Sequence, residues 1–329
     1  MAHLKKIAAA GMTLAMVVSV LPMTALAASH RNEWVQKDGK WYYYDGYGRK
    51  VKNKAEYDYT DGKYYLLDAN GVRVTKKGWY KTKKYTTEYG DTFKINFSYY
   101  IGKDGACVRN ELKKIGKKYY YFDYDGRMAT NRVVEHEKYD EETDDWSYSY
   151  YLIGSDGARI TKKGWHKIKT TSFSTYNGFK KTSTNYYYIL DTKGTVARKC
   201  VKKIGKKYYG FDYQGAMIKN GYAYSSNGKA YLFDKKGNHI KKKGWHKISS
   251  KTVWKGLDYS ETYKGTNWYY VKKDGTLQTG LKKIGKKYYY FEPEMLKCSS
   301  RTKNGKTYIF GKSGAHTKIV EGNYANYGS

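Results

Sequence analysis

The sequence predicts an all-β protein built as a solenoid of stacked β-hairpin repeats. Three observations predict this fold: an eleven-residue string that recurs three times, glycine-terminated turns at short intervals, and 41 tyrosines among 329 residues. Aromatic and β-branched residues between glycine-rich turns are typical of strands, and the chain has only two prolines. We therefore expect hairpins and no helices.

The first 27 residues have the pattern of a signal peptide. Lys5 and Lys6 precede an apolar run from residue 7 to residue 23, and "ALA" follows at 25–27. A membrane anchor is the alternative, but Pro22 and the small-x-small site favour cleavage, and no later segment is long and apolar enough to span a membrane. We expect export, which lowers the formal net charge from +33 to +31.

Two strings recur along the mature chain with a period of about 80–90 residues. One is Gly-Trp flanked by lysines, written "TKKGWYK" at 75–81, "TKKGWHK" at 161–167 and "KKKGWHK" at 241–247. The other is "LKKIGKKYYYFD" at 112–123, "VKKIGKKYYGFD" at 201–212 and "LKKIGKKYYYF" at 281–291. A long period of this kind indicates a repeat architecture.

Each long period divides into smaller units of an aromatic strand, a turn and a second short strand. Asp and Asn stabilise turns through bonds to the backbone, and Gly adopts the positive φ that closes them. With one degenerate copy at 291–295, the turns predict about eleven repeats over residues 28–318, followed by a tail at 319–329. The ten regular turns are 45–48, 68–71, 103–105, 123–126, 155–157, 191–194, 212–215, 234–237, 273–275 and 312–314.

Stacking explains why the chain repeats one strand. Tyr119 and Tyr121 point to one face of a strand, while Tyr120 and Phe122 point to the other. A lone hairpin is marginally stable in water. Hairpins stacked in series bury aromatic faces that none of them can bury alone, so repetition supplies the core.

The Gly-Trp start, aromatic strand and Asp-x-x-Gly turn resemble the cell-wall-binding repeat of Gram-positive surface proteins, which include choline-binding modules and glucan-binding repeats. The best match is "WVQKDGKWYYYDGYG" at 34–48; others lie at 62–71, 228–237 and 265–275. The resemblance implies ligand pockets between successive hairpins, each built from three aromatic residues. These are the Gly-Trp tryptophan, the aromatic four residues before the turn Asp, and the same position in the following hairpin. Such rings suit a quaternary ammonium or a stacked sugar ring.

Carried onto this chain, the resemblance implies four candidate ligand sites. Ser98 replaces the middle aromatic of one set, and Leu112, Val201 and Leu281 stand where the family usually places a tryptophan. The alternative is that all these rings are inter-repeat core. The four sets are Trp34, Trp41 and Tyr64; Trp245, Trp268 and Tyr288; Trp165, Tyr187 and Tyr208; and Trp79 with Tyr119.

No motif for catalysis, a metal or a cofactor is present. The chain has no P-loop, G-x-S-x-G or H-E-x-x-H, and its three cysteines contain no C-x-x-C. The acidic run at 135–145 lacks the spacing of a calcium loop and is interpreted as a solvated hairpin tip. His166 and His246 follow the Gly-Trp tryptophan where Tyr80 stands in another copy, which argues against a catalytic or metal role.

The predicted function is noncatalytic attachment of a secreted protein to a cell-wall or surface glycopolymer. Repeated "KKIGKK" and "KKGW" segments predict a cationic ridge suited to an anionic polymer such as teichoic acid, with avidity from several contacts. Nucleic acid would bind only nonspecifically, and membrane disruption has no amphipathic helix to support it. The alternatives are a glucan- or other polysaccharide-binding protein, or a repeat-only subunit of a wall hydrolase or toxin.

Overall fold

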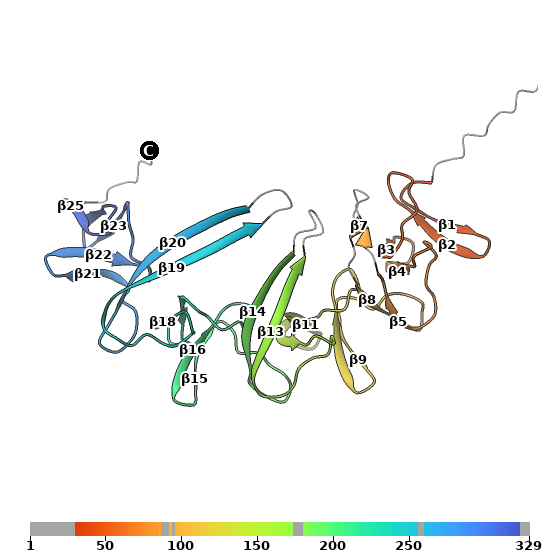
Figure 1. Cartoon of the computed structure of the whole chain (residues 1–329), viewed down its shortest axis with the longest axis horizontal. Helices are drawn as coiled ribbons and strands as arrows, with labels where there is room; N and C mark the ends of the chain where they lie inside the picture. The colour runs from red at the N-terminus through yellow and green to blue at the C-terminus, as the bar shows by residue number, and fades with distance from the viewer. Residues whose placement is uncertain are drawn as a thin grey trace, which may run out of the picture.

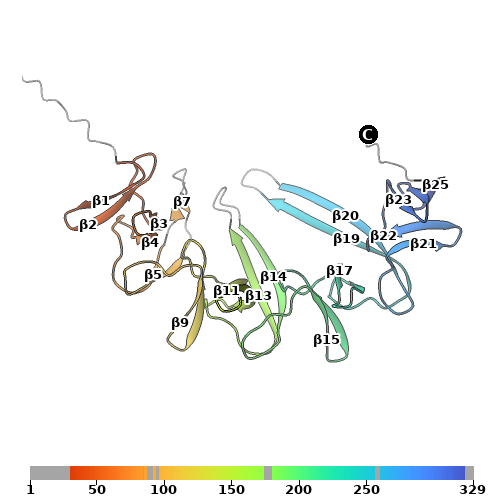
Figure 2. The same cartoon turned by 180° about the vertical axis from the view of Figure 1, so that it is seen from behind.

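The computed structural model describes residues 30–83, 85–86, 92–93, 96–173, 180–255 and 260–322; the predicted signal peptide lies outside them. Within these ranges every regular element is a β-strand, and the strands form small antiparallel sheets. The predicted all-β fold of stacked hairpins is confirmed. Figure 1 shows the hairpins following one another in a curved row from β1 to β25, and Figure 2 shows this row from behind.

In the described chain, consecutive strands pair with each other in every hairpin but one. In the described part of the chain, one sheet has a third strand, because β25 (His316–Glu321) pairs with β24. A short pair, β6 (Tyr85–Thr86) and β7 (Thr92–Phe93), lies between β5 and β8. The hairpins are β1 (Glu33–Lys37) with β2 (Lys40–Tyr44), β3 (Lys54–Asp58) with β4 (Lys63–Leu67), β5 (Gly78–Lys81) with β8 (Ser98–Ile101), β9 (Glu111–Ile115) with β10 (Lys118–Phe122), β11 (Arg132–Asp140) with β12 (Asp145–Ile153), β13 (Gly164–Phe173) with β14 (Lys180–Ile189), β15 (Cys200–Ile204) with β16 (Lys207–Phe211), β17 (Gly221–Tyr224) with β18 (Ala230–Phe233), β19 (Gly244–Lys255) with β20 (Ser260–Val271), β21 (Gly280–Ile284) with β22 (Lys287–Phe291), and β23 (Ser299–Lys303) with β24 (Lys306–Phe310).

The turn after β4 shows how the sequence ends a hairpin. The Asp68 carboxylate accepts hydrogen bonds from the backbone N–H groups of Asn70 at 2.8 Å and Val72 at 2.9 Å. Gly71 closes the turn with a φ of 80°, a conformation that costs glycine little and other residues more. Turns of this kind reverse the chain after each hairpin and lead it towards the next.

The core is a row of apolar side chains, one from the end of the second strand of every described hairpin after the first. Each residue of this set has 0–2 % of its surface exposed, and burial of one such side chain contributes roughly 1.5–3 kcal/mol. The row therefore runs the length of the array rather than gathering in one centre. Its members are Leu67, Ile101, Phe122, Ile153, Ile189, Phe211, Phe233, Val271, Phe291 and Phe310.

In most repeats, a residue one or two positions after the turn joins two hairpins through its backbone. It forms an isolated bridge to the end of its own hairpin, as Met217 does with Phe211. Its N–H also donates to a carbonyl of the preceding hairpin, and we call it the linking residue. Four such bonds matter below: Arg73 to Trp41 at 2.8 Å, Met128 to Ser98 at 2.7 Å, Met217 to Tyr186 at 2.7 Å, and Met295 to Trp268 at 2.8 Å.

The acidic segment at 135–145 is the outer half of the β11–β12 hairpin. Its tip, residues 141–144, is exposed, so the sequence interpretation as a solvated hairpin tip is confirmed. Near the tip the exposed rings of Tyr139 and Trp146 lie 5.1 Å apart. At the C-terminal end of the described array, β25 continues to Glu321, beyond position 318 where the sequence placed the end of the last repeat.

Candidate functional site

An aromatic cavity, here the Trp245 cage, lies where β19, β20 and β22 meet. The centroid of the Trp245 ring is 6.3 Å from that of Trp268 and 4.9 Å from that of Tyr289, and both pairs meet edge to face. The cavity has a volume of about 490 Å³. It is lined by Trp245, Trp268, Tyr289, Met295, Lys297, Lys312 and Ser313.

Strand alternation brings the two tryptophans to one face of the hairpin. Trp245 pairs across the hairpin with Tyr270, and Lys247 pairs with Trp268. Residues two apart on a strand share a face, and diagonal cross-strand neighbours are within reach of aromatic rings. The third ring, Tyr289, comes from the following hairpin, so the cage exists only when two repeats stack.

Met295 is the linking residue of this cage, and its side chain packs on the turn of the next hairpin. Gly314 has a φ of 79° in that turn, and a Cβ there would lie 2.5 Å from the Met295 Sδ. The absence of a side chain at Gly314 therefore makes room for the methionine. A thioether contacts aromatic rings favourably, so Met295 completes the wall without adding charge.

The Trp165 cage repeats this arrangement. The Trp165 and Tyr209 rings lie 4.9 Å apart, and Tyr186 pairs with Lys167 as Trp268 pairs with Lys247. The Lys219 ammonium lies 4.5 Å from the centroid of the Tyr186 ring. The cavity, of about 450 Å³, is lined by Trp165, Tyr186, Tyr209, Met217, Lys219, Lys235, Lys236 and Asn238.

The Trp79 cage lacks its middle ring. Trp79 lies 4.9 Å from Tyr120, ring centroid to ring centroid. Ser98 accepts the backbone bond of the linking residue Met128, which places it where Tyr186 and Trp268 stand in the other cages. This site therefore has a tryptophan and a tyrosine but no middle ring.

The Trp34 cage has its three aromatic residues but a charged linking residue. The Trp34 and Tyr65 rings meet edge to face at 5.9 Å, and Trp41 holds the middle position. The linking residue is Arg73, whose guanidinium carbon lies 3.2 Å from the Tyr65 centroid and 5.8 Å from that of Trp34. A cation of the chain itself therefore lies against two of the rings.

The structure brings the predicted tryptophans into the cages but turns the predicted third tyrosines away. The ring against each tryptophan belongs to the next residue: Tyr65, Tyr120, Tyr209 and Tyr289. Adjacent residues on a strand point to opposite faces of the strand. The face that the first hairpin presents to the cage is opposite to the face that the following hairpin presents to it. Counting to the same position in both hairpins therefore selects the side chain that points away.

The four tyrosines that the sequence selected pack on the other side, against the following repeat. The Tyr64 ring lies 4.1 Å from the guanidinium carbon of Arg109, and the Tyr119 ring 4.4 Å from that of Arg159. Tyr208 stacks on Tyr231 at 5.9 Å, and Tyr288 lies 5.2 Å from Tyr308. A ligand-binding role for these tyrosines remains a prediction.

Tyr187 was predicted to be the middle ring of the Trp165 cage, and the structure places Tyr186 there. Tyr187 is 5 % exposed and packs in a core cluster with Leu152 and Ile189. The turn after β14 is one residue longer than the turn after β20, since Ile189 bridges to Val196 but Val271 bridges to Leu277. Counting back from the turn Asp therefore selects a residue on the opposite face.

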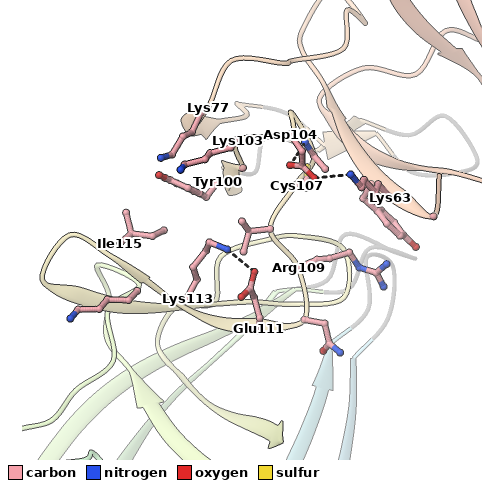
Figure 3. Close-up of a pocket in the computed structure, with 17 residues that line it drawn as sticks. Lys63, Lys77, Tyr100, Lys103, Asp104, Cys107, Arg109, Glu111, Lys113 and Ile115 are labelled. Atoms are coloured by element: carbon pink, nitrogen blue, oxygen red, sulfur yellow. Dashed lines mark hydrogen bonds and ion pairs between the residues drawn. The ribbon is translucent and has the colours of Figure 1, made fainter. Parts of the chain in front are cut away.

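A second candidate site is a basic pocket between the β3–β4, β5–β8 and β9–β10 hairpins (Figure 3). It encloses about 900 Å³, and its two carboxylates are ion-paired, Asp104 with Lys63 at 2.9 Å and Glu111 with Lys113 at 3.0 Å. The Lys63 bond lowers the pKa of Asp104. Figure 3 shows Lys77 and Lys103 across the pocket from Lys113 and Ile115.

The pocket keeps an excess of positive charge after these pairs are formed. Lys77, Lys103 and Lys114 also line it, and none of them has an ion-pair partner among the residues that the structure describes. Burial raises the pKa of the lining thiol Cys107 to about 12, so this cysteine is protonated near neutral pH. The pocket is therefore suited to holding anions and offers no thiolate nucleophile.

The histidines after the Gly-Trp tryptophans hold their own turns. Nε2 of His166 lies 2.6 Å from the Lys162 carbonyl oxygen, and Nε2 of His246 lies 2.6 Å from that of Lys242. The Tyr80 hydroxyl makes the same bond to the residue four positions earlier, at 2.8 Å. An N–H or O–H donor suffices for this bond, which explains why Tyr and His interchange.

No group of three metal-ligating side chains occurs in the described ranges.

Comparison with known proteins gives sequence relatives and structural neighbours, and no family model matches the chain. Glucosyltransferase-I of Streptococcus downei is 24% identical over 71% of this chain and 17% of its own length. Glucosyltransferase-S of Streptococcus mutans is 27% identical over 67% of this chain and 14% of its own length. The chain thus spans less than a fifth of either relative.

The solved structures that it resembles include choline binding protein F of Streptococcus pneumoniae, with 21% identity, a TM-score of 0.33, and coverage of 87% of this chain and 92% of that one. The choline-binding domain of CbpL from the same organism has 23% identity, a TM-score of 0.26, and coverage of 64% and 98%. The two sequence relatives agree with the resemblance predicted from the repeats. Among the described residues, no helix has the length and apolar character needed to cross a bilayer.

Proposed function

We propose that this chain, whose repeats are of the cell-wall-binding type, is an exported, noncatalytic protein that attaches to a glycopolymer of the cell wall or cell surface. The polymer carries quaternary ammonium and phosphate groups, as choline-bearing teichoic acid does. The observation that carries this proposal is the recurrence of one cage. At Trp165 and at Trp245, a tryptophan, a ring of the paired strand, a tyrosine of the following hairpin and a methionine surround a cavity of about 450 or 490 Å³.

The walls of these cages suit a cation that cannot donate hydrogen bonds. Ring faces attract a quaternary ammonium by about 0.5–2 kcal/mol each, most when the site is desolvated. Met217 and Met295 add a polarisable, uncharged surface. A primary amine would lose its hydrogen bonds to water on entering such walls, so they favour the methylated cation.

Lysines beside the same cages suit an anion attached to that cation. Lys297 and Lys312 line the Trp245 cage, and Lys235 and Lys236 line the Trp165 cage. None of these four has an ion-pair partner in the described part of the chain. They repel a bare cation but attract phosphate, which accepts strong charge-assisted hydrogen bonds. Phosphocholine combines both groups at a short distance and therefore suits the cage and its rim.

The basic pocket supplies a further contact to the same polymer. Its unpaired lysines Lys77, Lys103 and Lys114 would bind phosphates that carry no choline. Each contact is weak, but contacts repeated along one chain multiply through avidity. We therefore propose that residues 28–318 act as one array of about eleven repeats, exported through the signal peptide at 1–27.

We propose no reaction for this chain. The enzymatic activity in the names of the two relatives belongs to proteins of which the chain spans 17% and 14%. The titratable groups that catalysis would need serve the repeats instead. Asp191 accepts turn hydrogen bonds, and His166 and His246 contact turn carbonyls.

Glucan is the second candidate ligand, and the Trp79 site favours it. Ser98 supplies no middle ring there, and a tryptophan without that wall suits a stacked sugar ring better than an enclosed cation. The sequence relatives are glucosyltransferases, which adds support. A repeat-only subunit of a wall hydrolase or toxin would bind the wall and also form a stable complex with a second protein.

The test is retention of the exported protein on purified Gram-positive cell walls. We expect retention at low salt and release by phosphocholine, with glucan oligosaccharides as the matched competitor. Release by salt but not by phosphocholine would assign binding to the lysines and leave the rings as core. Release by glucan alone would favour the second candidate, and no retention would overturn wall attachment.

A further inference from the structure

We infer that Arg73 is a built-in occupant of the Trp34 cage and excludes the ligand from it, so that the linking residue decides which cages bind. This inference rests on the proposed function, because it concerns the cation that the cages take. It divides the four tryptophan-led sites into two open cages, at Trp165 and Trp245, a site without a middle ring at Trp79, and a filled cage at Trp34.

Backbone hydrogen bonds establish that the cages correspond residue by residue. The N–H of Arg73 donates to the Trp41 carbonyl, as that of Met295 donates to Trp268. Arg73 also bridges to Leu67 as Met295 bridges to Phe291. The two cages therefore have the same frame and the same two tryptophans, and their linking residues differ in charge.

The arginine takes a different direction from the methionines. The Met217 and Met295 side chains pack on Gly237 and Gly314 of the next turn, where an added Cβ would lie 3.0 and 2.5 Å from their sulfur atoms. At the corresponding Gly105, the atoms nearest to an added Cβ belong to Thr75, the closest at 3.4 Å. The Arg73 side chain thus does not pack on the glycine of the next turn, as the methionine side chains do.

The guanidinium lies instead where a ligand cation would bind. Its carbon is 3.2 Å from the Tyr65 centroid and 5.8 Å from that of Trp34. The Tyr65 hydroxyl donates to Asp61, and the Trp34 Nε1–H donates to the Tyr57 carbonyl oxygen at 3.2 Å. Both rings are therefore anchored and hold the guanidinium between fixed partners.

An occupant of this kind competes as a tethered ligand. A group fixed on the same chain acts at an effective concentration on the order of millimolar, and a ligand's apparent affinity falls by the fraction of time that the site is open. Lys219 in the Trp165 cage is a milder case, since its ammonium lies over Tyr186 alone, 4.5 Å from the centroid. The Lys219 side chain lies at the rim of the cage and can move into water without exposing a buried aromatic ring.

The experiment follows each tryptophan separately while phosphocholine is added. The exported protein is labelled with 5-fluorotryptophan, and the fluorine signals of Trp34, Trp165 and Trp245 are assigned by single replacement with phenylalanine. We expect the Trp165 and Trp245 signals to move and that of Trp34 to respond roughly tenfold more weakly or not at all. In Arg73→Met, Trp34 should respond with an affinity within a few-fold of that at Trp245.

The reciprocal variant Met295→Arg keeps the inference testable if Arg73→Met does not fold. In this variant, the fluorine signal of Trp245 should no longer change when phosphocholine is added, and the response of the Trp165 signal should stay unchanged. A Trp34 response in the natural chain equal to that of Trp245 would overturn the inference, and so would a silent Trp34 in a folded Arg73→Met protein whose Trp245 responds. A Trp245 that still responds in Met295→Arg would overturn it too. If no tryptophan responds in any variant, the proposed cation site fails and the inference with it.

Discussion

The N–H of Met295 donates to the carbonyl oxygen of Trp268 at 2.8 Å. The bond uses the backbone of Trp268 and leaves its indole free to form a wall of the cage. Assembly of the hairpins and recognition of a ligand therefore depend on different atoms of one residue. This separation allows the ring to be removed while the link between repeats stays.

Replacement of Trp268 by alanine should weaken phosphocholine binding at the Trp245 cage by about 2- to 30-fold, the range of one cation–π contact of 0.5–2 kcal/mol. Titration calorimetry measures the change. The matched control is Trp146→Ala, since Trp146 is 51 % exposed on the β11–β12 hairpin and lines neither the Trp165 nor the Trp245 cavity. Equal losses in the two variants would count against the cage.

Charge reversal in the basic pocket should separate the two kinds of contact. Lys77→Glu with Lys103→Glu adds negative charge beside Asp104 and Glu111, so retention on cell walls at low salt should fall. Because neither lysine lines the Trp245 cage, the affinity for free phosphocholine should stay unchanged. The difference between variant and natural chain should shrink as salt rises, since ions screen exposed charges. A salt-independent difference would contradict this role.

Gly194→Ala should destabilise the array more than Gly116→Ala. Both glycines have positive φ, so both substitutions carry a backbone cost of about 1–2 kcal/mol. A Cβ at Gly194 would also lie 2.6 Å from the Ile160 carbonyl oxygen, whereas Gly116 has nothing within 4 Å. Overpacking adds about 1–3 kcal/mol. Urea denaturation measures the difference, and equal midpoints for the two variants would refute the close approach.

The pH dependence of stability should differ in sign between two turn aspartates. Hydrogen bonds from the Thr195 side chain and backbone lower the pKa of Asp191. Its contribution is therefore present above the unfolded pKa of about 3.9 and is lost as the pH falls through the folded value. Burial raises the pKa of Asp212, so its contribution is present below about pH 3.9 and is lost as the pH rises through the folded value.

These signs are checked with Asp191→Asn and Asp212→Asn in urea between about pH 2.5 and 7. Relative to the natural chain, Asp191→Asn should lose stability as the pH rises from below the folded pKa of Asp191 to about 3.9. Asp212→Asn should gain relative stability as the pH rises from about 3.9 through the folded pKa of Asp212. Parallel pH profiles for the two variants would show that the two turns have the same electrostatic environment.

The sequence by itself determined the repeated hairpin, because its causes are local. Turn aspartates and glycines fix where each hairpin ends, and alternating aromatic strands require a neighbouring repeat to bury them. The Gly-Trp motif also marked the tryptophans that lead the cages at Trp79, Trp165 and Trp245, whereas Trp34 follows a glutamate. These features depend on residues close together in the chain, so a pattern in the sequence reveals them.

Only the tertiary structure decided which side chains meet at each cage. Tyr289 rather than Tyr288 faces Trp245, and Tyr186 rather than Tyr187 lines the Trp165 cage. A strand turns adjacent side chains to opposite faces, so one extra turn residue or the opposite face of the next hairpin changes the choice. The place of Arg73 between Tyr65 and Trp34 likewise depends on how two hairpins stack. Spacing in the sequence records neither the stacking nor the direction of a long side chain.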